Sequence, residues 1–168
     1  MQRFTAHSLE EMQKIAGDFA VKLSPKKDGA TVVGLSGDLG AGKTSFAQGV
    51  ARSLGVVDNV VSPTFVIEKI YEIVASSKKQ VASNGETKNP SLDSNNLLLA
   101  NFKHLIHIDA YRLEKSQELL HLGWQEIISD SGNLILVEWP ERVADVMPEH
   151  IRVNFTHLSE NVREVEVI

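Results

Sequence analysis

The chain has 168 residues, of which 42% are apolar and 23% are charged, and it contains no cysteine. This length fits one compact domain that buries about 70% of its extended surface, so a core forms without disulfides or a structural metal. The lack of cysteine excludes thiol catalysis, Cys-ligated zinc and iron–sulfur clusters, and it fits a reducing cytoplasmic location. The 17 basic and 22 acidic residues give a net charge of −5. Because no cationic stripe occurs, autonomous binding to a nucleic-acid backbone is disfavoured.

The sequence has no pattern that is typical of membrane insertion. The longest strictly aliphatic runs, such as Leu134–Val137, are far shorter than the roughly 20 residues that span a bilayer. The first residues, Met1-Gln-Arg-Phe, lack the apolar stretch of a signal peptide. We therefore expect a soluble cytoplasmic protein without a membrane partner.

The first elements predicted along the chain are a helix, a strand and a second helix. A capping-box pattern at Ser8–Glu11 precedes apolar residues at helical spacing, which predicts a helix over about 9–23. Residues 31–36 are apolar and bounded by glycines, so they indicate a buried strand. A second amphipathic helix follows and can end at Gly55 with a positive φ.

A long hairpin is predicted next. Residues 60–73 and 105–108 are rich in β-forming side chains, and the two segments are expected to pair. Between them, residues 76–96 contain five Ser, four Asn and three Lys, with few large apolar side chains. Such a composition supports little packing, so we expect a mobile insertion at the hairpin tip.

The remaining segments complete an α/β pattern. Residues 116–128 predict one helix, or two short ones broken near Gly123, and residues 134–137 predict a second buried strand. Residues 151–155 and 162–168 alternate with period two, which is typical of half-exposed strands near a sheet edge. We therefore expect a single domain over residues 1–168, with parallel core strands, antiparallel hairpins at the margins and flanking helices.

The segment Gly37-Asp-Leu-Gly-Ala-Gly-Lys-Thr44 fulfils the phosphate-loop pattern. Its glycines let backbone N–H groups turn toward phosphate oxygens, and the helix that follows adds unpaired donors and the positive end of its dipole. Lys43 can then reach the terminal phosphates of a nucleotide, and Thr44 can offer its hydroxyl to Mg²⁺. The alternative is a glycine-rich turn before an ordinary helix. The strand and the helix predicted on either side favour the phosphate loop.

Two apolar runs lead directly into a carboxylate, at Asp109 and at Glu138. Ligands of α/β sheets bind at the carboxyl ends of strands, and a phosphate loop needs an acidic partner for Mg²⁺. Each acid could instead be a solvated strand end. As site residues, one would hold Mg²⁺ or its water and the other would orient or deprotonate the attacking water. The sequence does not assign these two roles.

Several further residues have two interpretations. Ser62-Pro63-Thr64-Phe65 is either the start of a strand or a nucleotide-sensing switch, in which Thr64 approaches Mg²⁺ or the γ-phosphate. His104 and His107 are expected to be ordinary strand histidines, because no third ligand occurs at a zinc-like spacing. Trp139 is either a stacking or partner-facing aromatic or a partly buried one.

These motifs together resemble the TsaE (YjeE) family in order and spacing, over about residues 8–155. The motifs are Gly37–Thr44, Ser62–Phe65, His107–Leu113, Leu122-Gly123 and Val137–Arg142. The resemblance implies a bacterial cytoplasmic, Mg²⁺-dependent ATPase that is required for threonylcarbamoyladenosine modification of tRNA beside the anticodon. It also implies the TsaB and TsaD proteins as partners, of which TsaD performs the carbamoyl transfer. The chain would meet tRNA only through these partners.

The resemblance also implies roles for individual residues. Lys43, Asp109 and Thr64 would be catalytic, with Thr64 in the switch, while Thr44 and Glu138 would ligate Mg²⁺. The ATP-binding residues would be Gly37, Asp38, Leu39, Gly40, Ala41, Gly42, Lys43, Thr44, Ser45, Glu11, Trp139 and Arg163. The sequence departs from the family pattern at Gln48, where Arg is usual, at Ala110, where a larger residue is usual, and in the long connection 76–96.

Two other classes of protein use the same loop. A small-molecule or nucleotide kinase would need several Arg residues in a lid, and the six Arg residues of this chain are not clustered. A GTP-dependent switch would need a guanine-reading motif of Asn or Thr, Lys, any residue and Asp, yet Thr87-Lys88 continues as Asn89-Pro90. A nucleotide-binding module without hydrolysis is a further alternative. Phosphate release from ATP and GTP, with and without acceptors, would separate these classes.

Overall fold

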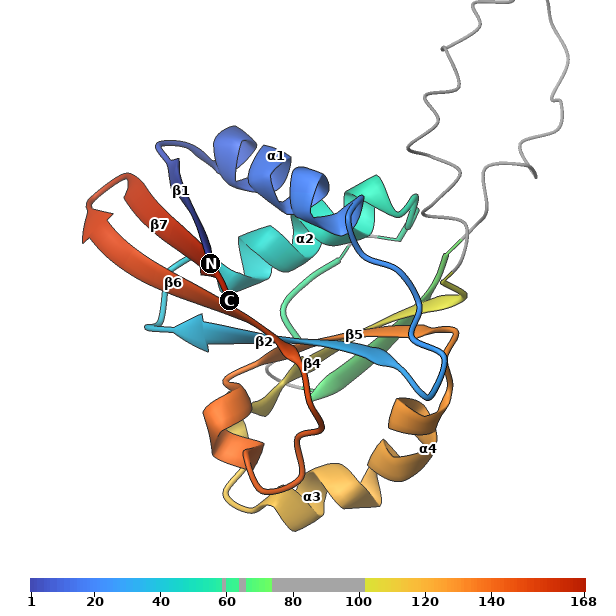
Figure 1. Ribbon diagram of the computed structural model, residues 1–168. Coiled ribbons are helices and arrows are strands. Elements are labelled where there is room, and N and C mark those ends of the chain that lie inside the picture. Colours follow the sequence, from blue (N-terminus) through green and yellow to red (C-terminus); the bar gives the residue numbers. More distant parts are fainter. Residues whose placement is uncertain (59, 64–65, 74–101) are drawn as a thin grey trace, which may run out of the picture.

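A mixed β-sheet organises the computed structural model, which describes residues 1–58, 60–63, 66–73 and 102–168 (Figure 1). Among these residues the sheet has seven strands in the order β1-β7-β6-β2-β5-β4-β3. The strands are β1 (Gln2–Ala6), β2 (Thr31–Gly37), β3 (Glu68–Glu72), β4 (His104–Asp109), β5 (Asn133–Glu138), β6 (Ile151–Ser159) and β7 (Val162–Val167). The helices are α1 (Leu9–Ala20), α2 (Lys43–Ser53), α3 (Ser116–His121) and α4 (Trp124–Ser129), and the short 3-10 helices are η4 (Ala110–Arg112) and η5 (Pro140–Val143).

The centre of the sheet is parallel and its margins are antiparallel. Strands β6, β2, β5 and β4 run parallel to one another, whereas the pairs β1–β7, β7–β6 and β3–β4 are antiparallel. This arrangement confirms the predicted fold class. Strand β1 was not expected from the sequence; it pairs with β7 and forms the outer strand on that side of the sheet.

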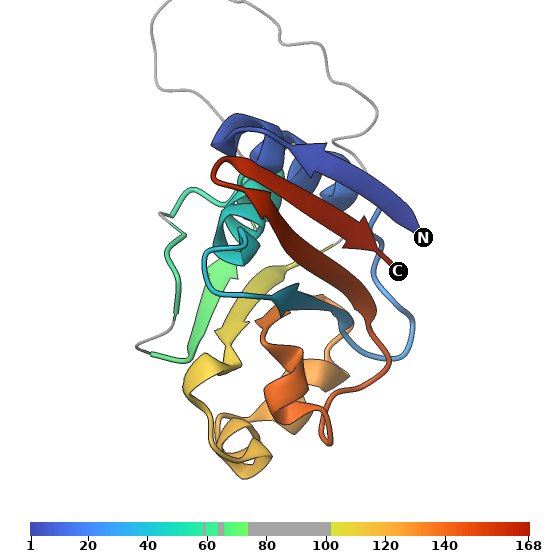
Figure 2. The same cartoon turned by 90° about the vertical axis from the view of Figure 1, so that its left-hand side faces the viewer.

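Helices cover both faces of the sheet. Figures 1 and 2 show α1 and α2 on one face and α3 and α4 on the other. Gly123, with φ of 81°, separates α3 from α4, so the second of the two alternatives, two short helices broken near Gly123, is the one observed. Trp124, the first residue of α4, is fully buried, and its Nε1–H donates to the carbonyl of Val146 at 2.9 Å. None of the described helices is long and apolar enough to cross a membrane.

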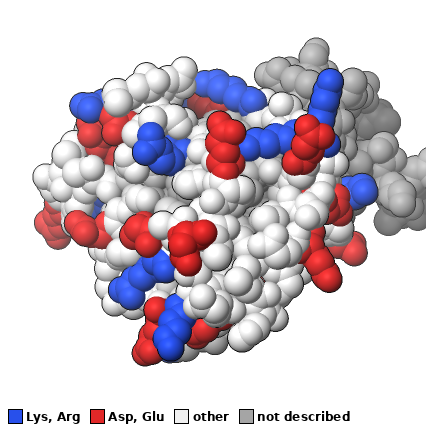
Figure 3. Space-filling view, turned by 60° about the horizontal axis from the view of Figure 1, so that its bottom comes forward, with Lys and Arg blue, Asp and Glu red and all other residues white. Residues whose placement is uncertain are grey.

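The α3–α4 side of the molecule carries charges of both signs. Figure 3 shows acidic and basic side chains interspersed over this face, with no continuous basic patch. Counterion release by clustered Lys and Arg is the main source of affinity for a nucleic-acid backbone. This face therefore offers no surface for strong nucleic-acid binding.

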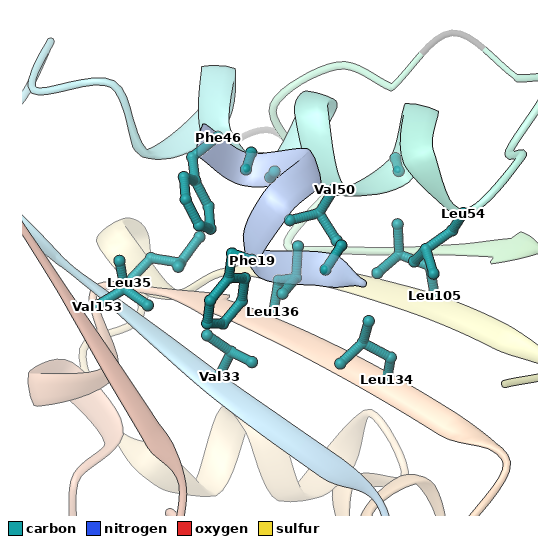
Figure 4. Close-up of a cluster of buried hydrophobic side chains, with 14 of the residues drawn as sticks. Phe19, Val33, Leu35, Phe46, Val50, Leu54, Leu105, Leu134, Leu136 and Val153 are labelled. Atoms are coloured by element: carbon teal, nitrogen blue, oxygen red, sulfur yellow. The ribbon is translucent and has the colours of Figure 1, made fainter. Parts of the chain in front are cut away.

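Helix α1 begins at the predicted capping box. Ser8 Oγ accepts from the backbone N–H of Glu11 at 3.2 Å, and Glu11 Oε2 accepts from the N–H of His7 at 2.7 Å. The helix ends at Ala20, three residues earlier than predicted, because the N–H groups of Lys22 and Leu23 bond to carbonyls only three residues back. Figure 4 shows the apolar side chains of α1 and α2, among them Phe19 and Phe46, directed at the sheet.

The predicted hairpin is present but shorter. Strands β3 and β4 pair antiparallel as expected, yet β3 begins only at Glu68. The predicted strand is wrong over the described residues 60–63 and 66–67. There the carbonyl of Pro63 accepts from the N–H groups of Val66 at 2.8 Å and Ile67 at 2.6 Å, and Ile67 has a φ of 66°. These bonds close a turn in place of a strand. The predicted insertion 76–96 lies outside the described residues.

The contact between α1 and α2 generates a stability prediction. A Cβ at Gly49 would lie 2.6 Å from Ala16 Cβ and 2.9 Å from Gln13 Cα. Gly49→Ala should therefore force the helices apart and lower the free energy of unfolding by about 1–3 kcal/mol, measured by urea denaturation. Gly17→Ala in α1 is the matched control, because the nearest atom to its Cβ would be Ser53 Oγ at 3.5 Å. Gly17→Ala should raise the free energy of unfolding by up to about 1 kcal/mol, because alanine has a higher helix propensity than glycine. Equal effects of the two variants would contradict this packing.

Candidate functional site

The glycine loop and both candidate acids lie at one edge of the sheet. The parallel register pairs Leu35 of β2 with Glu138, and it pairs Asp109 with Glu138. Residues 38–42 lead from the end of β2 into α2 at this edge (Figure 1). Ligands of α/β sheets bind where the carboxyl ends of parallel strands meet. The sheet therefore brings the loop and the acids to the position expected of a ligand site.

The loop conformation depends on glycine at two of its turns. Gly37 has a φ of 146°, and a Cβ there would lie 2.5 Å from the carbonyl oxygen of Phe155. Gly42 is the N-cap of α2 with a φ of 105°. The first turn of a helix leaves N–H groups without intrahelical partners, and these groups attract anions together with the helix dipole. In α2 they belong to the residues around Lys43, Thr44 and Ser45.

Lys43 is buried and its ammonium is held by the loop itself. Nζ donates to the carbonyls of Gly37 at 2.6 Å and Asp38 at 2.9 Å. It also lies 4.0 Å from the ring centroid of Trp139, within cation–π range. Burial lowers the pKa of Lys43 below the ordinary value, and carboxylates nearby, chiefly that of Glu138, oppose this shift.

Glu138 joins two side chains from different elements. Its Oε1 accepts from the hydroxyl of Thr44 at 2.9 Å and lies 2.8 Å from Nε2 of His107. Glu138 is 3% exposed and His107 is fully buried. The contact with His107 was not predicted from the sequence. Only the register of β4 against β5, which places these two residues diagonally across the strands, indicates it.

Asp109 ends β4 beside Glu138 and is 3% exposed. Its Oδ1 accepts from the N–H of Tyr111 at 2.9 Å and so caps η4, while Oδ2 accepts from the hydroxyl of Ser62 at 3.3 Å. Asp109 therefore links the site to the segment that contains Ser62 and Pro63. Thr64, the expected switch residue, lies outside the described residues.

Trp139 follows Glu138 in a left-handed conformation, with a φ of 58°. Its N–H donates to the carbonyl of Leu35 at 3.1 Å, and its ring lies 5.1 Å from that of Tyr111. A positive φ is uncommon for a bulky residue, and residues held in such conformations cluster at functional sites. In this conformation the indole lies against the ammonium of Lys43.

Two cavities flank the loop. The first, of about 230 Å³, lies on the acid side, and the second, of about 220 Å³, lies beside the start of α1 and the β6–β7 hairpin. Both cavities are lined by Gly40, Gly42 and Ser45, so the loop separates them. The first is also lined by Leu39, Lys43, Thr44, Ser62, Asp109, Tyr111, Glu138 and Trp139. The second is also lined by Ala6, His7, Ser8, Leu9, Met12, Glu160, Asn161 and Arg163.

Among the expected site residues, Leu39 and Arg163 each line a cavity, whereas Glu11 lines neither. Leu39 is 78% exposed at the tip of the loop. Arg163 lies on β7, where its Nε–H donates to the carbonyl of Gly40 at 3.2 Å and its Nη1 donates to carbonyls of the hairpin, so it ties the hairpin to the loop. Glu11 is exposed, lines neither cavity and uses its carboxylate as the cap of α1.

A family model described as Threonylcarbamoyl adenosine biosynthesis protein TsaE matches residues 6–165. The chain belongs to the TsaE family. The tRNA threonylcarbamoyladenosine biosynthesis protein TsaE of Rickettsia felis is 33% identical over 161 residues, which cover 95% of this chain and 75% of that protein. The protein of the same name from Haemophilus influenzae is 28% identical, over 96% of this chain and 83% of its own length.

A solved structure agrees with the sequence comparisons. The crystal structure of Bacillus subtilis YdiB is similar with a TM-score of 0.66 at 26% identity, over 99% of this chain and 83% of that one. The family assignment associates the TsaE chain with tRNA threonylcarbamoyladenosine biosynthesis. The resemblance and the phosphate-loop fold expected from the sequence are both confirmed.

The buried ammonium of Lys43 generates a pH prediction. Because burial disfavours its charged form, Lys43 should lose its proton at a lower pH than an ordinary lysine. Phosphate anion bound beside it should raise this pKa again, so that binding takes up a proton at alkaline pH. NMR titration of lysine labelled at Cε measures both values, with Lys43→Arg identifying the signal. A Lys43 pKa at or above the ordinary value in the free chain would contradict the proposed burial of its charge.

Proposed function

We propose that this TsaE chain is a Mg²⁺-dependent ATPase, a single domain over residues 1–168 that acts in the threonylcarbamoyladenosine modification of tRNA. One observation supports the proposal above all others. The loop, Lys43, Thr44, Asp109 and Glu138 line one cavity at the N-terminus of α2. This is the set of groups that phosphoryl chemistry requires: N–H donors and a cation for the phosphates, a hydroxyl and a carboxylate for Mg²⁺, and a second carboxylate for water.

In this proposal each of the two cavities binds one part of the nucleotide. The triphosphate lies against the loop on the acid side, where Lys43 exchanges its carbonyl partners for phosphate oxygens. The nucleoside lies across Gly40 and Gly42 in the second cavity, near Ser8 and Arg163. Shared lining by the loop supports this division, because a nucleotide that crosses the loop would contact both cavities. Glu11 then acts through the cap that shapes the start of α1.

Thr44 and Glu138 fit a magnesium site. Both offer hard oxygen ligands, and the two side chains are already 2.9 Å apart. Among the described residues, no group of three or more His, Cys, Asp or Glu could hold a metal ion. Mg²⁺ is commonly bound by one or two protein oxygens together with substrate phosphates and waters. Bound Mg²⁺ would neutralise phosphate charge, and the cation would enter with the nucleotide.

Asp109 is the residue that we assign to the attacking water. It lies beside Glu138 and lines the same cavity. Its hydrogen bonds to Ser62 and Tyr111 fix the direction of the carboxylate, and a fixed carboxylate can orient or deprotonate water. The link to Ser62 also supports a role for Thr64 as a switch that responds to the nucleotide.

Phosphate release from ATP and GTP tests the proposed activity. We expect Mg²⁺-dependent phosphate release from ATP in preference to GTP, and loss of this activity in Lys43→Ala. Transfer of the phosphate to an added small-molecule acceptor in place of water would indicate a kinase. Unchanged hydrolysis in a folded Lys43→Ala variant would overturn the assignment.

We propose the TsaB and TsaD proteins as partners, with tRNA reached only through them and with the cytoplasm as the location. Two exposed apolar side chains line the acid-side cavity and support a docking role. Leu39 is 78% exposed and Tyr111 is 40% exposed. Nucleotide phosphates need no apolar contacts, so these side chains are available to a protein surface. The net charge of −5 disfavours direct tRNA binding, and the absence of cysteine fits a reducing compartment.

The two acids should respond differently to neutralisation. Glu138→Gln should weaken Mg²⁺-dependent nucleotide binding at least about tenfold, because it removes a metal ligand from the ground state. Asp109→Asn should lower turnover about 100-fold or more with little change in binding, because its charge matters as the water is activated. Glu126→Gln is the matched control, since Glu126 is exposed on α4 and lines neither cavity. Equal effects of all three changes on binding and turnover would contradict these roles.

Partner docking can be tested at the loop tip. Leu39→Ser should lower the affinity of the ATP-analogue state for the TsaB–TsaD pair about tenfold, because burial of a leucine is worth at least about 1.4 kcal/mol. Val57→Ser should leave the affinity unchanged, because Val57 is 85% exposed and lines neither cavity. Calorimetry at fixed salt, with ATP analogue, ADP and no nucleotide, provides the comparison. An affinity that depends on neither Leu39 nor the nucleotide would contradict docking at this site.

A further inference from the structure

His107 has an unusual environment for a buried histidine. It lies on β4 with 0% exposure, among residues of the apolar core that α1 and α2 cover. Its Nε2 is 2.8 Å from Glu138 Oε1, while its buried Nδ1 has no hydrogen-bond partner among the described residues. One ring nitrogen therefore contacts a carboxylate oxygen, and the other makes no hydrogen bond to a described residue.

The direction of this hydrogen bond follows from the chemistry of the carboxylate. An ionised carboxylate only accepts hydrogen bonds, so Nε2 carries the hydrogen and donates it to Oε1. The same oxygen accepts from the hydroxyl of Thr44 at 2.9 Å. Two donors from two different elements, β4 and α2, therefore hold Oε1 in place. Without them the long side chain of Glu138 would have several rotamers available.

Packing alone does not account for a histidine at this position. Leu105 precedes it by two residues on the same face of β4, and Leu136 is its partner in the register with β5. A leucine would continue this apolar row and leave no polar atom unsatisfied. Burial of an unpaired Nδ1 is unfavourable for folding. The hydrogen bond from Nε2 to Glu138 is the interaction that can offset this cost.

We propose that His107 is a positioning residue for the cation that accompanies the nucleotide. It donates Nε2–H to Glu138 Oε1 and so holds the carboxylate beside Thr44, without contacting the nucleotide itself. Residues that orient a metal ligand by a hydrogen bond typically change metal affinity about 10–100-fold when they are replaced. The role rests on the proposed function, because it presumes that Glu138 ligates Mg²⁺.

The first test uses the nucleotide-free chain and requires no metal. The ¹⁵N NMR spectrum of labelled histidine, with His107→Gln to identify the signals, reports which ring nitrogen carries a hydrogen. A hydrogen on Nε2 of His107 supports the proposal. A bare Nε2 would overturn it, because that ring could not donate to Glu138.

The second test measures how much Mg²⁺ raises the affinity for a non-hydrolysable ATP analogue. The amide of Gln can reach the position of Nε2, whereas the shorter amide of Asn reaches only the position of Nδ1. In His107→Gln, the gain in analogue affinity that Mg²⁺ causes should therefore stay within about threefold of the wild-type gain. His107→Asn should lose about tenfold or more of that gain, with unchanged affinity in EDTA.

The outcomes separate this role from the proposed function. A wild-type chain that binds the analogue equally with Mg²⁺ and with EDTA would contradict the proposed function and with it the role of His107. A wild-type gain that His107→Asn retains would contradict the role of His107 alone. If His107→Asn binds the analogue equally more weakly in EDTA and in Mg²⁺, His107 has a purely structural role, and this result would also overturn the proposal. If His107→Asn fails to fold, the NMR test decides between the alternatives.

Discussion

The parallel pairing of β2, β5 and β4 is the constraint on which the candidate site depends. Apolar side chains of β2 and β5, such as Leu35 and Leu136, face the core beneath α1 and α2. Because side chains alternate along a strand, a slip of one residue would move these leucines out of that core. The same slip would turn Glu138 away from Thr44. The register that buries the core therefore also brings the carboxylates to the loop.

The polar groups of the site make hydrogen bonds to other groups of the same chain. Loop carbonyls bind the ammonium of Lys43, Thr44 and His107 contact Glu138, and Ser62 and Tyr111 donate to Asp109. Groups oriented in advance lose little conformational freedom when a ligand arrives. They also keep a buried ammonium and two buried carboxylates satisfied in one small cavity. These hydrogen bonds therefore let the fold keep charged groups of both signs close together.

The sequence was sufficient where a local pattern decides the structure. The glycine spacing indicated the loop, the capping box indicated the start of α1, and Gly123 indicated the break between α3 and α4. Strand β1 was missed because its stability comes from pairing with β7 at the other end of the chain, which no local pattern reports. The turn at Pro63 interrupts a run of β-forming residues, so propensity alone extended β3 too far. The contact of His107 with Glu138 depends on the register of two strands, and no spacing within either strand predicts it.

Chemical-shift mapping tests the central claim, namely that the loop between β2 and α2 binds the phosphates of a nucleotide. MgATP would be titrated into the ¹⁵N-labelled chain, with the same titration into Lys43→Ala as the control. If the loop binds the phosphates, the largest amide shifts should occur at Gly40, Gly42, Lys43 and Thr44, and none of comparable size should occur in the control. Shifts concentrated on the face of α3 and α4, or equal shifts at the loop in both chains, would contradict it.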